Sequence, residues 1–209
     1  MNYFTKENMR DAMEQISHLM ETNRDYLCEL DSQIGDSDLG LTMARGFAAA
    51  YEVAKNNTNS DIGTELKMIG FAISKEAPST MGTLIGSAFI GAGKSLTGNE
   101  QLDADGIALC FRSMADAAAK RGQSAEGEKT LLDVLFPVAR SVEACNSSDI
   151  KERMIVAVEQ AKESLENTKN LLSQHGRASV FREKTVGLID PGAAAACLVI
   201  EGFGKSCGL

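Results

Sequence analysis

Three aspartates lie close together in one short stretch of the chain, from Leu30 to Gly40. Asp31, Asp36 and Asp38 are separated only by two serines, a glutamine, an isoleucine and a glycine. Like charges repel, so this crowding is typical either of a solvated loop that caps a helix or of a loop that binds a cation. Carboxylate oxygens suit Mg²⁺, which is usually held by a few carboxylates together with the phosphates of a substrate.

Two familiar aspartate motifs do not fit this stretch. An EF-hand counted from Asp36 would need a glutamate at the twelfth position, where the chain has Phe47. A phosphatase-type nucleophile should follow a hydrophobic strand, but residues 27–30 continue a helical pattern. We therefore expect Asp31 near the end of one helix, with Asp36 and Asp38 just before the next. There the carboxylates meet a helix N-terminus, which favours phosphate. A solvated capping loop remains the alternative.

A second stretch, AFIGAGKS at residues 88–95, looks like a phosphate-binding loop with alanine in place of the first glycine. Such a loop needs a buried strand before it and a helix after it. Here a helix rich in glycine and alanine precedes the motif, and a turn follows at once. We expect Gly91, Gly93 and Lys94 to serve helix packing and helix termination.

Three further segments mark helix ends with glycine and polar residues. They are Gly127–Asp133, with a potential Thr130/Asp133 capping pair, Gly176–Ser179 and Asp190–Ala193. Each segment alone is an ordinary helix end or turn that needs no ligand. An up-and-down array of helices would gather such ends, with the aspartate loop, on one face, and a ligand would bind there.

Helical periodicity dominates the rest of the chain, and convincing strands are almost absent. Thr5, Asp103, Ser148 and Asp190 are the expected N-caps. A proline at 137 should kink its helix, a polar break is expected at 56–60, and 179–188 should form an extended loop. The expected helices cover about 5–20, 40–55, 62–74, 80–94, 103–120, 130–142, 148–172 and the residues after 190. This predicts one all-α domain over residues 1–209.

Composition narrows the class of protein. A net charge of −8 disfavours nucleic acid as a partner, because binding to a phosphate backbone needs clustered basic residues. The chain has no apolar run of the roughly 20 residues that a membrane span needs. Its first residues lack the apolar core of a signal peptide. Five well-separated cysteines fit reduced thiols. These features predict a cytoplasmic protein without a membrane segment.

Five blocks together resemble the nucleotide-binding L subunits of dihydroxyacetone kinases, in the order and spacing of that family. The family fold is a closed barrel of eight antiparallel amphipathic α-helices with the nucleotide at one end. The resemblance therefore implies this fold for nearly the whole chain. The blocks are Leu30-Asp-x-x-Ile-Gly-Asp-x-Asp-x-Gly40, Met43-Ala-Arg-Gly-Phe47, Gly127-x-Lys-Thr-x-x-Asp-x-Leu135, Gly176-Arg-Ala-Ser179 and Asp190-Pro-Gly-Ala193.

The resemblance also implies a set of site residues. Asp31, Asp36 and Asp38 would hold two Mg²⁺ ions that bridge to the phosphates of ADP or ATP. Arg177 would be the catalytic residue and would reach toward the phosphates. The implied nucleotide-binding residues are Leu39, Gly40, Leu41, Thr42, Ser79, Thr80, Met81, Gly122, Thr130, Leu131, Arg177, Asp190, Pro191 and Gly192.

A kinase subunit that needs partners is the implied function. A separate K subunit would carry dihydroxyacetone or a similar hydroxy-ketone, and this chain would supply the phosphoryl group. A free-standing L subunit favours resident ADP that an M subunit of the phosphotransferase system rephosphorylates through a phosphohistidine. The chain alone should then be inactive, and a homodimer is possible.

Two departures from the family pattern affect the phosphate end. Leu39 stands where the family usually has histidine, and Pro78-Ser-Thr-Met-Gly82 replaces Gly-Gly-Ala-Ser-Gly. They favour two alternatives, a kinase module for another carried substrate (a different ketose or a fatty acid) or a non-catalytic, nucleotide-loaded regulator. Lys129 and Arg177 are the two cations expected near the site. We interpret Arg177 as the residue that donates hydrogen bonds to the phosphate oxygens, with capping of a helix C-terminus as the alternative.

Overall fold

The computed structural model describes residues 1–57 and 61–209, and within these ranges it contains nine α-helices and two 3₁₀ segments. No strand occurs in the described ranges, apart from a single bridge between Phe4 and Leu102. The elements are α1 (Lys6–Thr22), α2 (Arg24–Ser32), α3 (Leu39–Asn56), α4 (Ile62–Glu76), α5 (Thr80–Ser95), α6 (Ala104–Gly122), α7 (Leu132–Ala144), α8 (Ile150–Asn167), η1 (Thr168–Asn170), η2 (Arg177–Thr185) and α9 (Pro191–Ser206).

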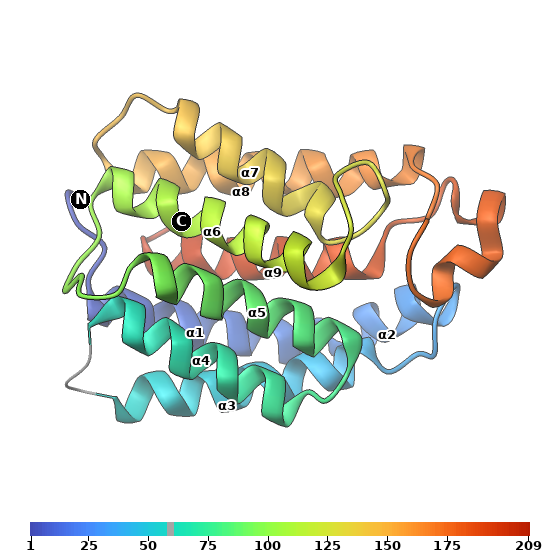
Figure 1. Ribbon diagram of the computed structural model, residues 1–209, viewed down its shortest axis with the longest axis horizontal. Coiled ribbons are helices and arrows are strands. Elements are labelled where there is room, and N and C mark those ends of the chain that lie inside the picture. The colour runs from blue at the N-terminus through green and yellow to red at the C-terminus, as the bar shows by residue number, and fades with distance from the viewer. Residues whose placement is uncertain (58–60) are drawn as a thin grey trace.

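The long helices lie side by side along the long axis of the molecule (Figure 1). Helix α1 packs on α3, and from α3 to α9 each long helix packs on the next in sequence. Helix α9 then packs back on α1, so that the pairwise contacts run in a ring. The short helix α2 lies at one end and packs mainly on α3 (Figure 1). The all-α class is confirmed, and these contacts follow the order expected for the predicted barrel.

Helix α9 is buried along almost its whole length because its residues are mostly small. Phe203 is its large anchor, with ring centroids 5.7 to 6.3 Å from those of Phe4, Phe89 and Phe111. A Cβ on Gly202 would lie 2.2 Å from an Ile16 side-chain carbon, so glycine permits the close contact of α9 with α1. The central packing of α9 fixes the position of its first turn, where the sequence predicts part of the site.

Several helix starts agree with the sequence. Thr5 forms a capping box with Asn8, and Asp103 caps α6. The start of α8 differs, because Asp149 rather than Ser148 accepts the hydrogen bond from the Lys151 amide, at 2.9 Å. Aspartate and serine are N-caps of similar strength, so sequence could not choose between neighbours.

The predicted end of α8 at 172 was wrong, since the helix stops at Asn167 and continues as the 3₁₀ turn η1. The Thr168 hydroxyl accepts a hydrogen bond from the Asp190 amide at 3.1 Å, a tertiary contact that fixes this turn. The extended loop expected at 179–188 is also wrong in part. Residues 177–185 form η2, which is broken at Arg182, where φ is 47°. Of the break expected at 56–60, residues 58–60 lie outside the described residues.

The glycine-rich stretch at 88–95 lies inside α5, as expected. A Cβ on Gly91 would lie 2.2 Å from the Cβ of Ala117, and one on Gly93 would lie 2.5 Å from the Gly63 carbonyl oxygen. These glycines allow α5 to approach α6 and α4 closely, and Lys94 lies in the last turn of the helix. The helix-packing interpretation is confirmed.

In the described part of the chain, none of the helices has the length and apolar character that crossing a membrane would require.

Candidate functional site

A cavity of about 610 Å³ opens at the end of the bundle where α3, α5, α7 and α9 begin. This is the end that carries α2 and the segment before α9, on the right in Figure 1. The cavity is lined by the aspartate loop and by the four helix starts, together with the connection that precedes α9. Its lining residues are Asp31, Ile34, Gly35, Asp36, Asp38, Leu39, Pro78, Ser79, Thr80, Met81, Leu84, Lys129, Thr130, Leu131, Ser173, His175, Gly176, Arg177, Ala178, Asp190, Pro191 and Gly192.

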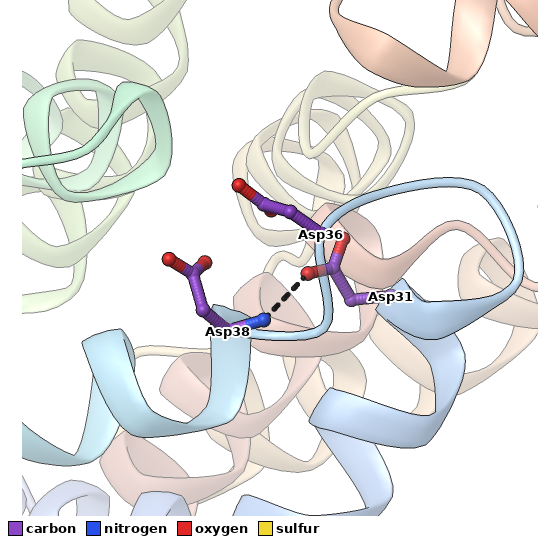
Figure 2. Close-up of side chains that lie close together, drawn as sticks. All are labelled: Asp31, Asp36 and Asp38. Atoms are coloured by element: carbon purple, nitrogen blue, oxygen red, sulfur yellow. Dashed lines mark hydrogen bonds between the residues drawn. The ribbon is translucent and has the colours of Figure 1, made fainter.

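The three aspartates converge on one side of this cavity (Figure 2). One oxygen from each carboxylate lies within 4.8 Å of the others. Asp31 lies in the last turn of α2, and its Oδ2 accepts hydrogen bonds from the amides of Asp38 and Leu39, at 3.1 and 3.3 Å. Asp31 thus connects the end of α2 to the start of α3. Gly35 leaves room for it, because a Cβ there would overlap the Asp31 carboxylate.

The cluster carries more negative charge than its surroundings compensate. Arg177 forms an ion pair with Asp36, with Nη2 and Oδ2 2.8 Å apart. Partial burial and the charges of Asp36 and Asp31 raise the pKa of Asp38. Asp36 and Asp38 are also exposed, so their oxygens are accessible to a cation. Three carboxylates, of which one is paired with an arginine, offer hard oxygen donors that fit a divalent ion such as Mg²⁺.

Two of the helix starts around the cavity, those of α5 and α9, are capped by the side chains of their N-cap residues. Ser79 accepts a hydrogen bond from the Gly82 amide at 3.1 Å, and Asp190 accepts one from the Ala193 amide at 2.7 Å. Asp190 is the N-cap of α9, with Pro191 in the first turn, as predicted. Burial raises the pKa of Asp190 to about 7. The converging N-terminal ends favour an anion in the cavity.

The loop before α7 is held by Asp133, whose carboxylate accepts hydrogen bonds from the amides of Gly127 and Thr130. The expected Thr130/Asp133 pair is therefore present. The Thr130 hydroxyl in turn accepts a hydrogen bond from the Leu132 amide at 3.2 Å. This bonding fixes Leu131, which is buried and lines the cavity.

Most of the predicted site residues line the cavity, but four do not. Gly40 packs against α2, where a Cβ would overlap the Arg24 carbonyl oxygen. Leu41 points to solvent and is 57% exposed, while Thr42 is buried in α3. Gly122 is not among the lining residues but lies next to Leu84, which is, because a Cβ on Gly122 would lie 3.1 Å from a Leu84 side-chain carbon. Sequence could locate the segments but not the direction of each side chain.

The structure also brings in residues that the sequence did not suggest. Leu84 lies one turn into α5 and adds an apolar side chain to the cavity. His175 lies at its edge, where Nε2 and a Glu128 oxygen are 2.6 Å apart. The sequence did give one indication for His175, because it directly precedes the Gly-Arg-Ala-Ser turn at 176–179. Leu84 carried no such signal, because a leucine in an apolar helix is usually a core residue.

Lys129 does not act as a second free cation. Its side chain is buried, and Nζ donates hydrogen bonds to the carbonyl oxygens of Leu171, Thr185 and Leu188. Arg177 is thus the accessible cation at this cavity among the residues that the structure describes, and it does not cap a helix. It contacts Asp36 across the cavity instead.

Comparison with known proteins agrees with this geometry. The family model of the DAK2 domain matches residues 33–205, which is most of the chain. The chain belongs to the DAK2 domain family.

Curated DAK2 relatives include subunits of nearly the same length. The ADP-binding subunit DhaL of the PEP-dependent dihydroxyacetone kinase of Escherichia coli K12 is 32% identical over 187 residues, which is 88% of each chain. The ADP-binding subunit DhaL of PEP-dependent dihydroxyacetone kinase 1 of Listeria innocua is 32% identical over 182 residues, 87% of each chain.

A solved structure shows the same fold. The dihydroxyacetone kinase of C. freundii in complex with AMP-PNP and Mg²⁺ superposes with a TM-score of 0.72 at 21% sequence identity. The match covers 94% of this chain and 33% of that kinase, so our chain spans about a third of its length. The DAK2 fold thus occurs both as a separate subunit and as part of a longer kinase chain.

Proposed function

We propose that this chain is the nucleotide-binding subunit of a kinase that acts on dihydroxyacetone or a similar small hydroxy-ketone. One observation carries the proposal. Three carboxylates and several helix N-termini meet in a single cavity, a combination that suits a metal ion and a polyphosphate together. The two relatives of matching length are both named as ADP-binding subunits of dihydroxyacetone kinases.

In this proposal Asp31, Asp36 and Asp38 hold two Mg²⁺ ions with ADP or ATP. Bound Mg²⁺ would neutralise phosphate charge. The starts of α3, α5 and α9 would face the phosphates, as their dipoles favour anions. Leu131 and Leu84 would provide the apolar surface for the base, with Gly122 behind Leu84.

Arg177 is proposed as the catalytic residue, which would donate hydrogen bonds to the phosphoryl group during its transfer. Phosphoryl transfer spreads negative charge over the oxygens of the transferred group, and enzymes stabilise it mainly by positioning and charge neutralisation. Arg177 has a side chain that is 70% exposed and already reaches Asp36, so its guanidinium can move onto phosphate oxygens without losing a buried contact. A guanidinium is suited to this role because it binds two oxygens and stays charged.

Partners complete the proposed function. A K subunit would carry the substrate, and an M subunit of the phosphotransferase system would donate phosphate from a phosphohistidine to resident ADP. Both relatives quoted above are called PEP-dependent, which supports this route over free ATP. In this proposal the chain works in the cytoplasm with these partners. Whether it forms a homodimer can be measured by solution scattering.

A different carried substrate, such as another ketose, is the second candidate. Leu39 and Met81 place apolar side chains at the cavity, where the family pattern has histidine and serine. The Met81 methyl carbon packs against Gly192, since a Cβ on that glycine would lie 2.4 Å from it. This end of the cavity therefore offers fewer hydrogen-bond donors than the family pattern.

Reconstitution tests the proposal. The purified chain is mixed with a candidate K subunit and supplied either with ATP or with a phosphorylated M subunit, and phosphorylation of dihydroxyacetone and other ketoses is measured. We expect turnover only in the complete mixture and only with a ketose. Turnover by the isolated chain would contradict the division of labour, and transfer to a ketose other than dihydroxyacetone would favour the second candidate.

A further inference from the structure

The connection that carries Arg177 has almost no apolar core of its own. Between Leu172 and Leu188 the buried side chains are Ser173 and Thr185, and both are polar. Val180 is 80% exposed, and Phe181 points outward as well. Hydrophobic burial therefore cannot fix the place of this segment, which projects beyond the helices in Figure 1. Polar contacts must do so.

Lys129, in the loop before α7, supplies the largest group of these contacts among the described residues. Its Nζ donates to the carbonyl oxygens of Leu171 at 3.2 Å and Leu188 at 2.7 Å, and to that of Thr185. These acceptors lie at the start and the end of the connection, so one ammonium group closes it. An ammonium has three donors, and all three are used here.

The neighbouring Glu128 adds a second attachment. Its carboxylate contacts Nε2 of His175 at 2.6 Å, and its carbonyl oxygen accepts a hydrogen bond from the Gln174 amide at 3.2 Å. His175 lies two residues before Arg177. Residues 128 and 129 together thus hold the connection at both ends and beside the arginine.

The loop that carries Glu128 and Lys129 is itself fixed by its backbone conformation and its hydrogen bonds. Gly127 and Lys129 both have positive φ, at 92° and 58°. Asp133 accepts hydrogen bonds from the amides of Gly127 and Thr130, which ties the loop to the first turn of α7. A non-glycine residue in the left-handed region is held there by its surroundings. The same loop carries Leu131 into the cavity wall.

We propose that Lys129, assisted by the Glu128–His175 contact, is a positioning residue that sets the place of Arg177 in the cavity. Lys129 does this without contacting the nucleotide, because its three donors bind main-chain carbonyl oxygens. Among the described residues no carboxylate forms an ion pair with it, so its role is to order backbone. The inference rests on the proposed function for the part played by Arg177.

Lys129→Met tests this, since methionine keeps much of the buried chain but removes the donors. In reconstituted enzyme we expect kcat to fall roughly tenfold or more, the scale of losing alignment at a transition state. The Kd for Mg-ADP should stay within about threefold. A loss of Mg-ADP affinity as large as that of Asp36→Ala would overturn the proposal, because it would show a direct phosphate contact.

A double-mutant cycle separates positioning from general destabilisation. If Lys129 acts through Arg177, then adding Lys129→Met to Arg177→Ala should lower turnover little further. Fully additive losses would overturn the proposal. Lys205→Met is the matched control, as Lys205 is an exposed lysine in the last turn of α9 far from the cavity. It should leave turnover unchanged.

Limited trypsin digestion gives a readout that needs no activity. Arg182 and Lys184 lie within the connection, and loosening it should speed cleavage there about tenfold in Lys129→Met but not in Lys205→Met. Equal cleavage in wild type and Lys129→Met would overturn the proposal even if no K subunit supports turnover. Absence of turnover in wild type, with faster cleavage in the variant, would instead reject the proposed function alone.

His175→Ala keeps the test decisive if Lys129→Met does not fold. This side chain lies partly exposed at the cavity edge, so the variant should fold. We expect the same two effects at smaller size, a few-fold in cleavage and in kcat. Unchanged cleavage and unchanged kcat in a His175→Ala protein would contradict the proposal.

Discussion

Carboxylates at the two ends of the bundle differ in their exposure to solvent. At the cavity end, Asp31, Asp36 and Asp38 form a cluster with accessible oxygens and an arginine nearby. At the other end, Glu65 lies in the first turn of α4 and is 1% exposed, and its Oε2 has no hydrogen-bond partner among residues 1–57 and 61–209. Burial raises the pKa of Glu65 to about 7, while the nearby Lys6 lowers it.

The difference shows what exposure does to an acidic group. The exposed cluster presents accessible carboxylate oxygens that can gain energy by binding a cation. A buried carboxylate without a partner relieves its cost by taking a proton. We therefore expect the first region to control ligand binding and the second to control stability as a function of pH.

Asp36→Ala should give the largest effect. A unit charge a few ångströms from a divalent ion is worth several kcal/mol near a protein surface, so Mg-ADP affinity should fall by about 10²-fold or more. Calorimetry with wild type and variant measures this. Asp25→Ala is the matched control, because Asp25 is an aspartate of α2 whose side chain is 92% exposed. Equal affinity in wild type and Asp36→Ala would remove the aspartate loop from the site.

Arg177→Ala should lower reconstituted turnover by roughly 10²-fold, the scale of losing one transition-state donor. Nucleotide and Mg²⁺ affinity should change little, because the aspartates and helix starts remain. Arg177→Lys should recover only part of the activity, since an ammonium cannot bind two oxygens in the same way. Normal turnover in the alanine variant would leave the Asp36 ion pair as the only role of this arginine.

Glu65→Gln should stabilise the protein at neutral and higher pH. The folded state holds the Glu65 proton more tightly than the unfolded state, so wild-type stability from this group falls as pH rises from about 4.5 to 7. At about pH 8 the variant should be more stable by about 1–3 kcal/mol, or several degrees in Tm. At about pH 5 the two proteins should melt alike. A stabilisation that is equal at both values would show that charge is not the cause.

Lys94→Ala should have the smallest effect. Lys94 ends α5 at the end of the bundle away from the cavity, despite the phosphate-loop pattern around it. Mg-ADP affinity measured by calorimetry should equal that of wild type. A tenfold weaker affinity would restore the phosphate-loop interpretation and place a nucleotide at the Glu65 end.

The sequence by itself determined the helical class and the main candidate site. Periodicity and capping residues located most helices, because both signals are local. The aspartates were visible as a cluster because they are neighbours in sequence. The glycine-rich pattern at 88–95 could be set aside because no strand precedes it.

Only the tertiary structure decided which side chains meet. The contact of Arg177 with Asp36, and the hydrogen bonds from Lys129 to the connection before α9, join residues far apart in the sequence. The same holds for the exposure of Leu41, the position of Leu84 at the cavity and the burial of Glu65. Such contacts depend on how helices are rotated and packed against each other, and sequence periodicity specifies a buried face but not the residue that will lie opposite it.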